Sequence, residues 1–238
     1  MLNHINKHAE GQRSIPEMRS DLIAIATHQF KTPISAISSS IELLETKMQR
    51  DELMLPFYER NLSRIKEEID ILSNMVDDML TTGSMIAGNP VTKPEETDLP
   101  VFAAMIRQQY FSRRTDQRQL HIRIYGRPRA ISIDRSHLAG ILTNLISNAF
   151  KYSTGNPLLS LHYRKNHLCI KVKDNGIGIP EADIRFLFTP YFRAANARSK
   201  EGTGLGLAIV KSYVVANNGH ITVNSGATGS VFIVTFNY

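Results

Sequence analysis

Two asparagines four residues apart could bind a metal ion. Asn144 and Asn148 lie where the apolar residues have helical spacing, so both belong to one face of a helix predicted over residues 135–151. Lys151 and Tyr152 follow one turn later and add a cation and an aromatic ring to this part of the helix. An amide oxygen suits Mg²⁺, which takes most other ligands from water and substrate phosphates. Each asparagine alone is better explained as a buried hydrogen-bonding residue, so the pattern needs support from other motifs.

Two glycine-rich segments could bring the backbone close to a ligand. Asp174-Asn175-Gly176-Ile177-Gly178 follows a predicted strand; its glycines permit close approach, and Asp174 offers a carboxylate acceptor. Taken alone, this segment is better explained as a turn. Gly202-Thr203-Gly204-Leu205-Gly206-Leu207 opens a predicted helix, where free backbone amides favour a phosphate. The second segment lacks the ending of a P-loop and the setting of a dinucleotide fingerprint.

His28 could act as a nucleophile, because a neutral imidazole nitrogen is competent near pH 7. It precedes the inward-facing position Phe30 by about 200° around a helix, so we expect it to face solvent. Pro33 removes a backbone hydrogen bond and allows a local bend beside it. For a lone histidine, an ordinary surface position is the commoner explanation.

A helical hairpin must carry the histidine. Between Met18 and Met85 the apolar residues follow helical spacing, with a break near 51–56 that contains Pro56. They form heptad stripes at Ile34, Ile37, Ile41, Leu44 and Met48 in the first helix and at Leu62, Ile65, Ile69, Leu72, Val76 and Met79 in the second. These stripes predict a homodimeric four-helix bundle. The alternative is a monomeric arm packed on its own C-terminal domain.

A mixed domain must carry the asparagines and glycines. Residues 88–100 contain three prolines and show no periodicity, which predicts a linker. Beyond it we expect helices near 101–114, over 135–151 and from Gly204, strands near 120–125, 130–133, 158–163 and 168–173, and a hairpin over 220–236. Consecutive strand pairs with segregated helices predict an α+β layer.

The composition excludes several classes of protein. With 238 residues, 42% hydrophobic and 21% charged, the chain is typical of globular proteins with one or two domains. The single cysteine, Cys169, indicates a reducing compartment. No apolar run approaches the ~18 residues that span a bilayer, and the N-terminus lacks a signal-peptide core. The net charge is +6, but no groove-reading or base-stacking motif accompanies it, so we expect no direct nucleic-acid binding.

Several segments, in their order along the chain, resemble one superfamily. Asn144-Leu-Ile-Ser-Asn148-Ala-Phe-Lys151-Tyr152 and the two glycine-rich segments resemble the ATP-binding domain of the gyrase, Hsp90, histidine kinase and MutL superfamily. Phe186-Leu-Phe188-Thr-Pro-Tyr191-Phe192-Arg193 resembles the phenylalanine box of the histidine kinases. Thr27-His28-Gln29-Phe30-Lys31-Thr32-Pro33 resembles the phosphoacceptor box of HisKA-type sensor kinases. The resemblance covers residues 18–238.

The resemblance implies a multidomain fold. An all-α helical hairpin, which forms a dimeric four-helix bundle, is followed by an α+β two-layer ATP-binding domain. The implied boundaries are an N-terminal linker over 1–16, a dimerisation and histidine phosphotransfer domain over 17–88, a linker over 89–99, and a catalytic and ATP-binding domain over 100–238.

The resemblance also assigns roles at the phosphates. His28 is the phosphoacceptor, and ATP with Mg²⁺ is the donor. Asn148 is the metal ligand, while Asn144 contacts a phosphate or the metal's shell. Lys151 neutralises phosphate charge, and Arg193, on the mobile ATP lid, stabilises the γ-phosphate. The MutL and gyrase relatives carry a water-activating Glu at the position of Asn144, and its absence argues against a simple ATPase.

Other roles concern the nucleoside and the backbone. The resemblance implies that Asp174 accepts a hydrogen bond from the adenine amino group and that Tyr152 stacks on the base. The remaining nucleotide-binding residues that it implies are Gly176, Gly178, Gly202, Thr203, Gly204, Leu205 and Gly206.

One residue departs from the phosphoacceptor pattern. The family usually has Glu or Asp directly after the histidine, where it is thought to act as the activating base, and this chain has Gln29. Gln cannot accept a proton, and a positioned base contributes about 10²–10⁴-fold in rate. Thr32 matches the family position that orients water for dephosphorylating the partner. The alternatives are therefore a degenerate kinase acting as an ATP-gated dimeric interaction module and a regulator with mainly phosphatase activity.

The resemblance thus implies the core of a sensor histidine kinase in two-component signalling. His28 is autophosphorylated from Mg²⁺-ATP, and the phosphate then passes to an aspartate of a response-regulator receiver domain. We expect a homodimer that is cytoplasmic as given and is the cytoplasmic part of a membrane-anchored protein. Any membrane contact would lie in segments absent from this chain.

Overall fold

The computed structural model divides the chain into two units, residues 1–88 and 89–238. It describes residues 15–53, 55–87, 92–112, 114, 116–200 and 202–238; the side chains of residues 15–29, of residue 67 and of most of 70–87 lie outside this description. None of the described helices combines the length and hydropathy that a bilayer crossing needs.

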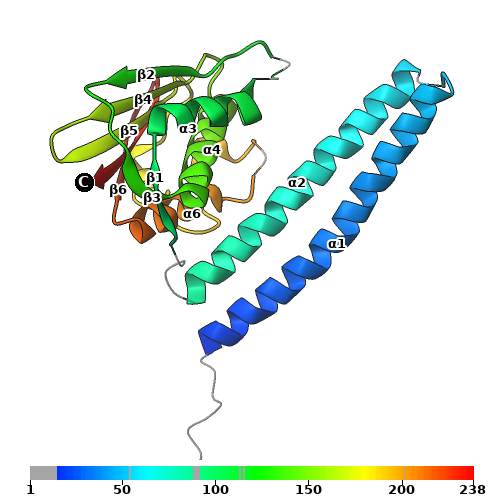
Figure 1. Cartoon of the computed structure of the whole chain (residues 1–238), viewed down its shortest axis with the longest axis horizontal. Coiled ribbons are helices and arrows are strands. Elements are labelled where there is room, and N and C mark those ends of the chain that lie inside the picture. Colours follow the sequence, from blue (N-terminus) through cyan, green and yellow to red (C-terminus); the bar gives the residue numbers. More distant parts are fainter. Residues whose placement is uncertain (1–14, 54, 88–91, 113, 115, 201) are drawn as a thin grey trace, which may run out of the picture. The chain divides into compact units, whose positions relative to one another are not determined.

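The first unit is a hairpin of two long helices, as the apolar spacing predicts. Helix α1 (Ile15–Arg50) and helix α2 (Pro56–Ala87) run antiparallel and side by side (Figure 1). The turn between them is closed by the amide of Leu53, which donates to the carbonyl oxygen of Met48 at 2.8 Å. Pro33 lies inside α1 without ending the helix.

The heptad stripes have two sides. Ile41, Leu62 and Ile69 form a buried cluster, against which Ile34 and Met48 pack. The alternate stripe positions, Ile37, Leu44, Ile65 and Leu72, are between 44% and 57% exposed. The hairpin therefore covers only half of its own apolar stripe.

The second unit contains a five-stranded mixed sheet. Its strands are β2 (His121–Tyr125), β4 (Leu158–Tyr163), β5 (His167–Lys173), β6 (His220–Gly226) and β7 (Gly229–Asn237), in the spatial order β2-β4-β5-β7-β6. The pair β2 and β4 is parallel, and the other pairs are antiparallel. A separate pair is formed by β1 (Pro94–Thr97) and β3 (Ile131–Asp134).

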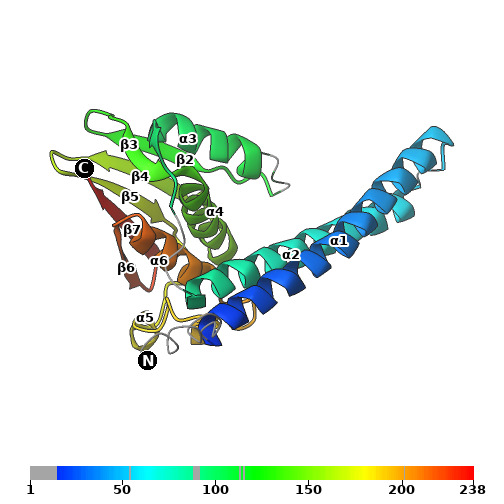
Figure 2. The ribbon, with the colours of Figure 1, turned by 60° about the horizontal axis from the view of Figure 1, so that its bottom comes forward.

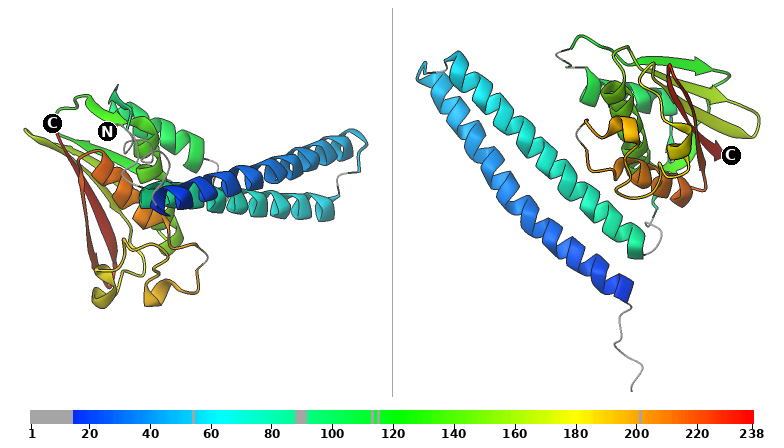
Figure 3. Two further views of the ribbon diagram at one scale, coloured as in Figure 1. Left: turned by 90° about the horizontal axis from the view of Figure 1, so that it is seen from below. Right: turned by 180° about the vertical axis from the view of Figure 1, so that it is seen from behind.

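Helices cover one face of this sheet, which gives the predicted α+β arrangement. They are α3 (Leu99–Ile106), continued by a π-helical turn (Arg107–Phe111), α4 (Arg135–Tyr152) and α6 (Gly206–Ala216) (Figures 2 and 3). Short helices α5 (Glu181–Ile184) and Ala195–Ala197 lie between β5 and α6. The core fills the space between sheet and helices, with Leu138, Ile141, Leu142, Leu161 and Ile170 fully enclosed.

Two details of the sequence prediction are wrong. The segment predicted as a linker over 89–99 contains β1 and the Asp98 cap of α3, so part of it belongs to the second unit. Pro94 can start this short strand because a first strand residue needs no amide donor. The predicted strands near 120–125 and 130–133 do not pair with each other: β2 pairs with β4, and β3 with β1. Such pairings depend on distant chain segments and leave no local signal.

Candidate functional site

Helix α4 carries the two asparagines. It begins at Asp134, whose Oδ1 accepts hydrogen bonds from two first-turn amides at 2.9 and 3.1 Å. The helix buries Leu138, Ile141, Leu142, Leu145 and Ile146 in the core. Asn144, Asn148 and Lys151 lie away from that face and are half-buried. The core-facing pattern therefore fixes which way the polar side chains turn.

The start of α6 lies against Asn144. The Nδ2 of Asn144 donates to the carbonyl oxygen of Gly140 at 3.0 Å, while its Oδ1 lies 2.5 Å from where a Cβ on Gly206 would be. No side chain caps α6 at Leu205, so its first-turn amides are open to an anion. The side chain of Asn148 forms no hydrogen bond with any described residue. An amide oxygen without a protein partner, one turn along α4 from the Asn144 side chain that faces α6, fits a magnesium ion with bound phosphates.

Asp174 is a buried carboxylate at the end of β5. Its side chain is 6% exposed, and Oδ1 accepts from the amides of Gly176 at 2.8 Å and Ser230 at 3.3 Å. Burial raises the pKa of Asp174, and the two amides partly oppose that rise. The second oxygen, Oδ2, accepts no hydrogen bond from the described residues, which leaves it available to an amino group.

The glycine turn after Asp174 joins it to the end of α4. The amide of Ile177 donates to the carbonyl oxygen of Tyr152 at 3.2 Å. A Cβ on Gly176 would collide with that same oxygen, so only glycine fits the approach. Gly178 has a φ of 63°, a conformation that favours glycine. The backbone of Tyr152 is thus held against the turn that follows Asp174.

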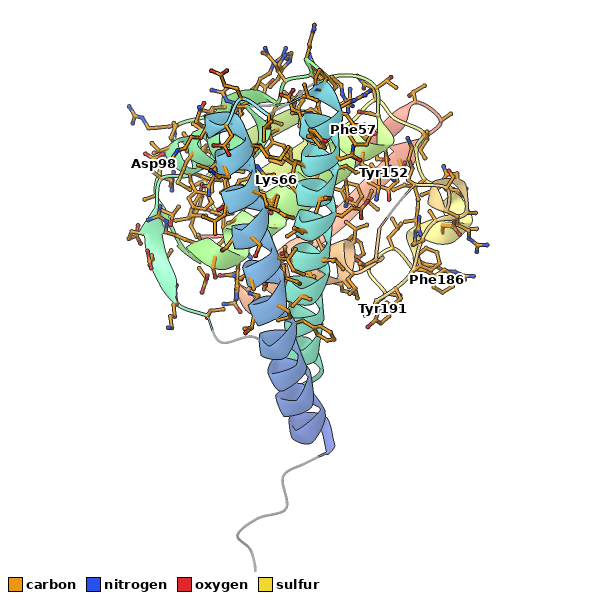
Figure 4. All side chains as sticks on the ribbon, turned by 90° about the vertical axis from the view of Figure 1, so that its right-hand side faces the viewer. Phe57, Lys66, Asp98, Tyr152, Phe186 and Tyr191 are labelled. Atoms are coloured by element: carbon orange, nitrogen blue, oxygen red, sulfur yellow. The ribbon has the colours of Figure 1, made fainter. Side chains whose placement is uncertain are left out.

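The segment between α5 and α6 is the predicted ATP lid. Phe186 and Phe192 pack with ring centres 5.5 Å apart. Phe186 and Tyr191 of this segment can be followed in Figure 4. The amide of Tyr191 donates to the carbonyl oxygen of Gly204 at 3.0 Å, and both residues have positive φ angles. The phenylalanine box therefore holds the glycine segment that opens α6.

Arg193, which is predicted to stabilise the γ-phosphate, is bonded to the backbone of the lid in this structure. Its Nη2 donates to the carbonyl oxygens of Ala197 and Arg198 at 3.0 Å and to that of Lys200. The guanidinium therefore holds three carbonyl groups of the lid backbone together. Burial raises the pKa of the Tyr152 phenol, and the nearby positive charge of Arg193 partly opposes that rise.

Lys151 connects the helix to the lid. Its Nζ lies 2.7 Å from where a Cβ on Gly202 would be, and Gly202 has a φ of 141°. The Oγ1 of Thr203 accepts from the amide of Leu205 at 3.3 Å. The asparagine helix, the Asp174 turn and the lid glycines thus meet in one place.

The phosphoacceptor segment lies in the other unit. His28 and Gln29 are in α1, but their side chains lie outside the described residues. Thr32 is exposed on the same helix.

Three residues of the site have no counterpart in the sequence prediction. Ser230 donates its amide to Asp174, a Cβ on Gly229 would collide with the carbonyl oxygen of Asp174, and Asn196 donates to the carbonyl oxygen of Gly178 at 3.0 Å. The pairing of β5 with β7 brings the first two to Asp174. Gly229 was recognisable only as a turn residue, and Asn196 carried no signal.

Family models match both units. The model described as "His Kinase A (phospho-acceptor) domain" matches residues 18–88. The model described as "Histidine kinase-, DNA gyrase B-, and HSP90-like ATPase" matches residues 133–238.

Curated relatives and solved structures agree with these matches. Sensor protein kinase WalK of Staphylococcus haemolyticus is 32% identical over 230 residues, covering 93% of this chain and 37% of that protein. A WalK of Staphylococcus aureus has the same identity and chain coverage, and this chain spans 54% of its length. Full-length ShkA in complex with AMPPNP aligns over 91% of this chain and 45% of its own, with a TM-score of 0.74 and 21% identity. The Acinetobacter baumannii histidine kinase AdeS aligns over 88% and 97%, with a TM-score of 0.60 and 24% identity. The two structural alignments show a shared fold.

Proposed function

The chain belongs to the HisKA-type histidine kinases, of which it has the catalytic core, and from that membership we propose that it transfers the γ-phosphate of Mg²⁺-ATP to His28. The observation that carries the proposal is the meeting of three motifs. Asn144 faces Gly206, Lys151 faces Gly202, and Tyr152 is bonded to the turn after Asp174.

The nucleoside end of ATP would be held at the buried carboxylate. Two amides fix Oδ1 of Asp174, so Oδ2 is the atom that accepts the adenine amino group. The ring of Tyr152 supplies a stacking surface. A buried acceptor discriminates well, because a base without the amino group would leave it unpaired.

The phosphate end would lie between α4 and α6. Asn148 would hold Mg²⁺ through its amide oxygen, and Asn144 would contact a phosphate or a metal-bound water. The ion supplies charge compensation when bound. The open amides of α6 and Lys151 bind the remaining phosphate charge.

The proposed step is a phosphoryl transfer to nitrogen. An imidazole nitrogen of His28 forms a bond to the γ-phosphorus while the bond to the bridging β–γ oxygen breaks, and ADP leaves with that electron pair. The imidazole proton passes to solvent because Gln29 cannot accept it. Reliance on solvent predicts a slower transfer than a Glu or Asp at that position would give.

The phosphoryl group would then pass to an aspartate of a response-regulator receiver domain. The exposed half of the hairpin stripe supports a homodimer as the working form. Thr32 is placed one helical turn after His28, so removal of phosphate from the partner is the second candidate activity.

The test is incubation of the whole chain with Mg²⁺ and γ-labelled ATP. We expect acid-labile, base-stable label on the parent and none on His28→Ala or Asn148→Ala. His220→Ala and Asn224→Ala change exposed residues of β6 and serve as matched controls, so they should label like the parent. An unlabelled parent that still binds ATP would contradict autokinase activity.

A further inference from the structure

A basic cleft with a volume of about 590 Å³ lies on the second unit beside the candidate nucleotide site. It is lined by Arg114, Asp116, Arg118, Ser147, Phe150, Lys151, Ser153, Thr154 and Lys200. Four of these side chains are cationic and one is acidic. The cleft shares Lys151 with the nucleotide site, but its other α4 residues come from a neighbouring face of the helix.

Asp116 organises the arginines of this cleft. Its carboxylate accepts from Arg114 at 3.0 and 2.5 Å and from Arg118 at 2.8 Å. Both guanidiniums lie over the ring of Phe150, at 4.2 and 5.3 Å from its centre. The pair holds the pKa of Asp116 well below its usual range, so the carboxylate stays ionised. The arginines are therefore held in place before any ligand arrives.

The end of a helix is ordinarily a poor place for an anion, because its last carbonyl oxygens are exposed. Here Arg118 Nη1 donates to the carbonyl oxygens of Phe150 and Ser153 at 2.8 and 2.6 Å. The hydroxyl of Ser153 donates to that of Ala149 at 2.7 Å. With these acceptors satisfied, the cleft presents an excess of positive charge.

Arg114 and Arg118 differ in their hydrogen-bond partners. Arg118 is engaged with the helix end and with Asp116. Arg114 uses Nε and Nη2 on Asp116, while its Nη1 makes no hydrogen bond with the described residues. The hydroxyls of Ser147 on α4 and of Thr154 just beyond its end add neutral donors to the lining. An oxyanion with several acceptor oxygens matches this set of donors.

We propose that the cleft is a second anion site, which binds a phosphate group carried by inorganic phosphate, pyrophosphate or a small phosphate ester. The charge, the pre-positioned guanidinium edge and the hydroxyls define the ligand class. The site is distinct from the adenine pocket, and its occupation requires neither ATP nor catalysis.

The experiment titrates the whole chain calorimetrically with pyrophosphate, without Mg²⁺ or ATP. We expect Arg114→Gln and Lys200→Gln each to weaken binding about threefold to tenfold, since each removes a charge-assisted contact. These residues come from separate segments, so misfolding of one variant, seen in its thermal unfolding, leaves the other decisive. Parallel titrations with inorganic phosphate and ribose 5-phosphate show whether the free anion or the ester binds better.

Matched controls separate this site from general basicity and from the nucleotide site. Arg127→Gln and Lys165→Gln remove exposed cations elsewhere and should bind like the parent. Equal losses in the cleft variants and the exposed controls would overturn the proposal. So would no binding by the parent, or loss in Asn148→Ala with unchanged cleft variants, because the pyrophosphate would then occupy the nucleotide site. The labelling experiment tests kinase activity separately.

Discussion

The buried carboxyl group of Asp174 has opposite effects on folding stability and on the proposed binding of ATP. Burial raises the pKa of its carboxyl above the ordinary value, so the ionised form is less favourable in the folded chain than in the unfolded chain. This group favours folding most at low pH, and that contribution is lost as the pH rises through the folded pKa. Where the carboxyl is ionised, its burial costs stability, and the proposed contact with an adenine amino group would offset that cost.

Replacing Asp174 by Asn should separate these two effects. The amide cannot present the same acceptor at the Oδ2 position, so ATP affinity should fall at least about tenfold, the range expected for a lost hydrogen bond to a charged group. Thermal stability at neutral pH should be equal or higher, because no buried charge remains. Calorimetric ATP titration and thermal unfolding measure the two quantities. Unchanged ATP affinity in a folded variant would contradict the role of Asp174.

The sequence indicated which residues come together here better than it indicated the hydrogen-bond partners of each side chain. Asn144, Tyr152 and Asp174 come together because strand, turn and helix boundaries were readable from apolar spacing and glycines. The hydrogen bonds from Arg193 to lid carbonyl oxygens could not be predicted, because such partners carry no sequence signal. A cation near a phosphate motif can serve either the ligand or the loop that covers it.

At the scale of elements, His137 ties α4 to α6. Its ring stacks on Tyr213 with centres 4.3 Å apart, and Nδ1 lies 3.0 Å from Nδ2 of Asn217. Since an amide nitrogen donates, Nδ1 must accept and the ring must be neutral. Burial lowers the pKa of His137, although the charge of Asp134 opposes this.

The neutral ring predicts acid sensitivity. The unfolded chain takes up a proton at His137 near its ordinary pKa of about 6.5, and the folded chain does so only at lower pH, so stability falls as the pH drops below that value. His137→Gln should flatten the dependence of the urea midpoint between about pH 5 and pH 7.5. His220→Gln, at an exposed histidine, should keep the parent slope. Equal slopes for parent and His137→Gln would contradict this account.

The start of α3 offers a second test at this scale. Oδ1 of Asp98 accepts from the amide of Val101 at 3.1 Å and caps the helix. Asp98→Ala should lower the free energy of unfolding by about 1 kcal/mol, measured in urea. Glu96→Ala, an exposed neighbour on β1, should have little effect. A loss of equal size in both variants would point to the strand rather than the cap.

Local elements were more predictable than their pairing. The helices, the hairpin turn and the strands of the main sheet follow from periodicity and from Pro and Gly positions. Strand β1 was missed because four residues beginning at Pro94 form a strand only through β3, far along the chain. The cap at Asp98 lies immediately before a Leu-Pro pair, and the prolines around it made the segment resemble a linker.

At the scale of the whole molecule, the two units differ in charge. Residues 1–88 carry 13 acidic and 9 basic side chains, and residues 89–238 carry 9 acidic and 19 basic ones. The basic excess expected from composition therefore belongs to the second unit, where it accompanies proposed phosphate contacts. Clustered positive charge favours anionic ligands as a class.

The half-covered hairpin stripe predicts the surface through which two chains associate. Ile37, Leu44, Ile65 and Leu72 recur at heptad spacing and are exposed in one chain, as expected where a second hairpin completes a bundle. Leu44→Glu should shift the whole chain from dimer to monomer in sedimentation equilibrium, because the charge would have to be buried without a partner. Leu43→Glu is the matched control, since Leu43 is 72% exposed and lies off the stripe. If both variants stay dimeric, or the parent is monomeric, the stripe does not form the dimer interface.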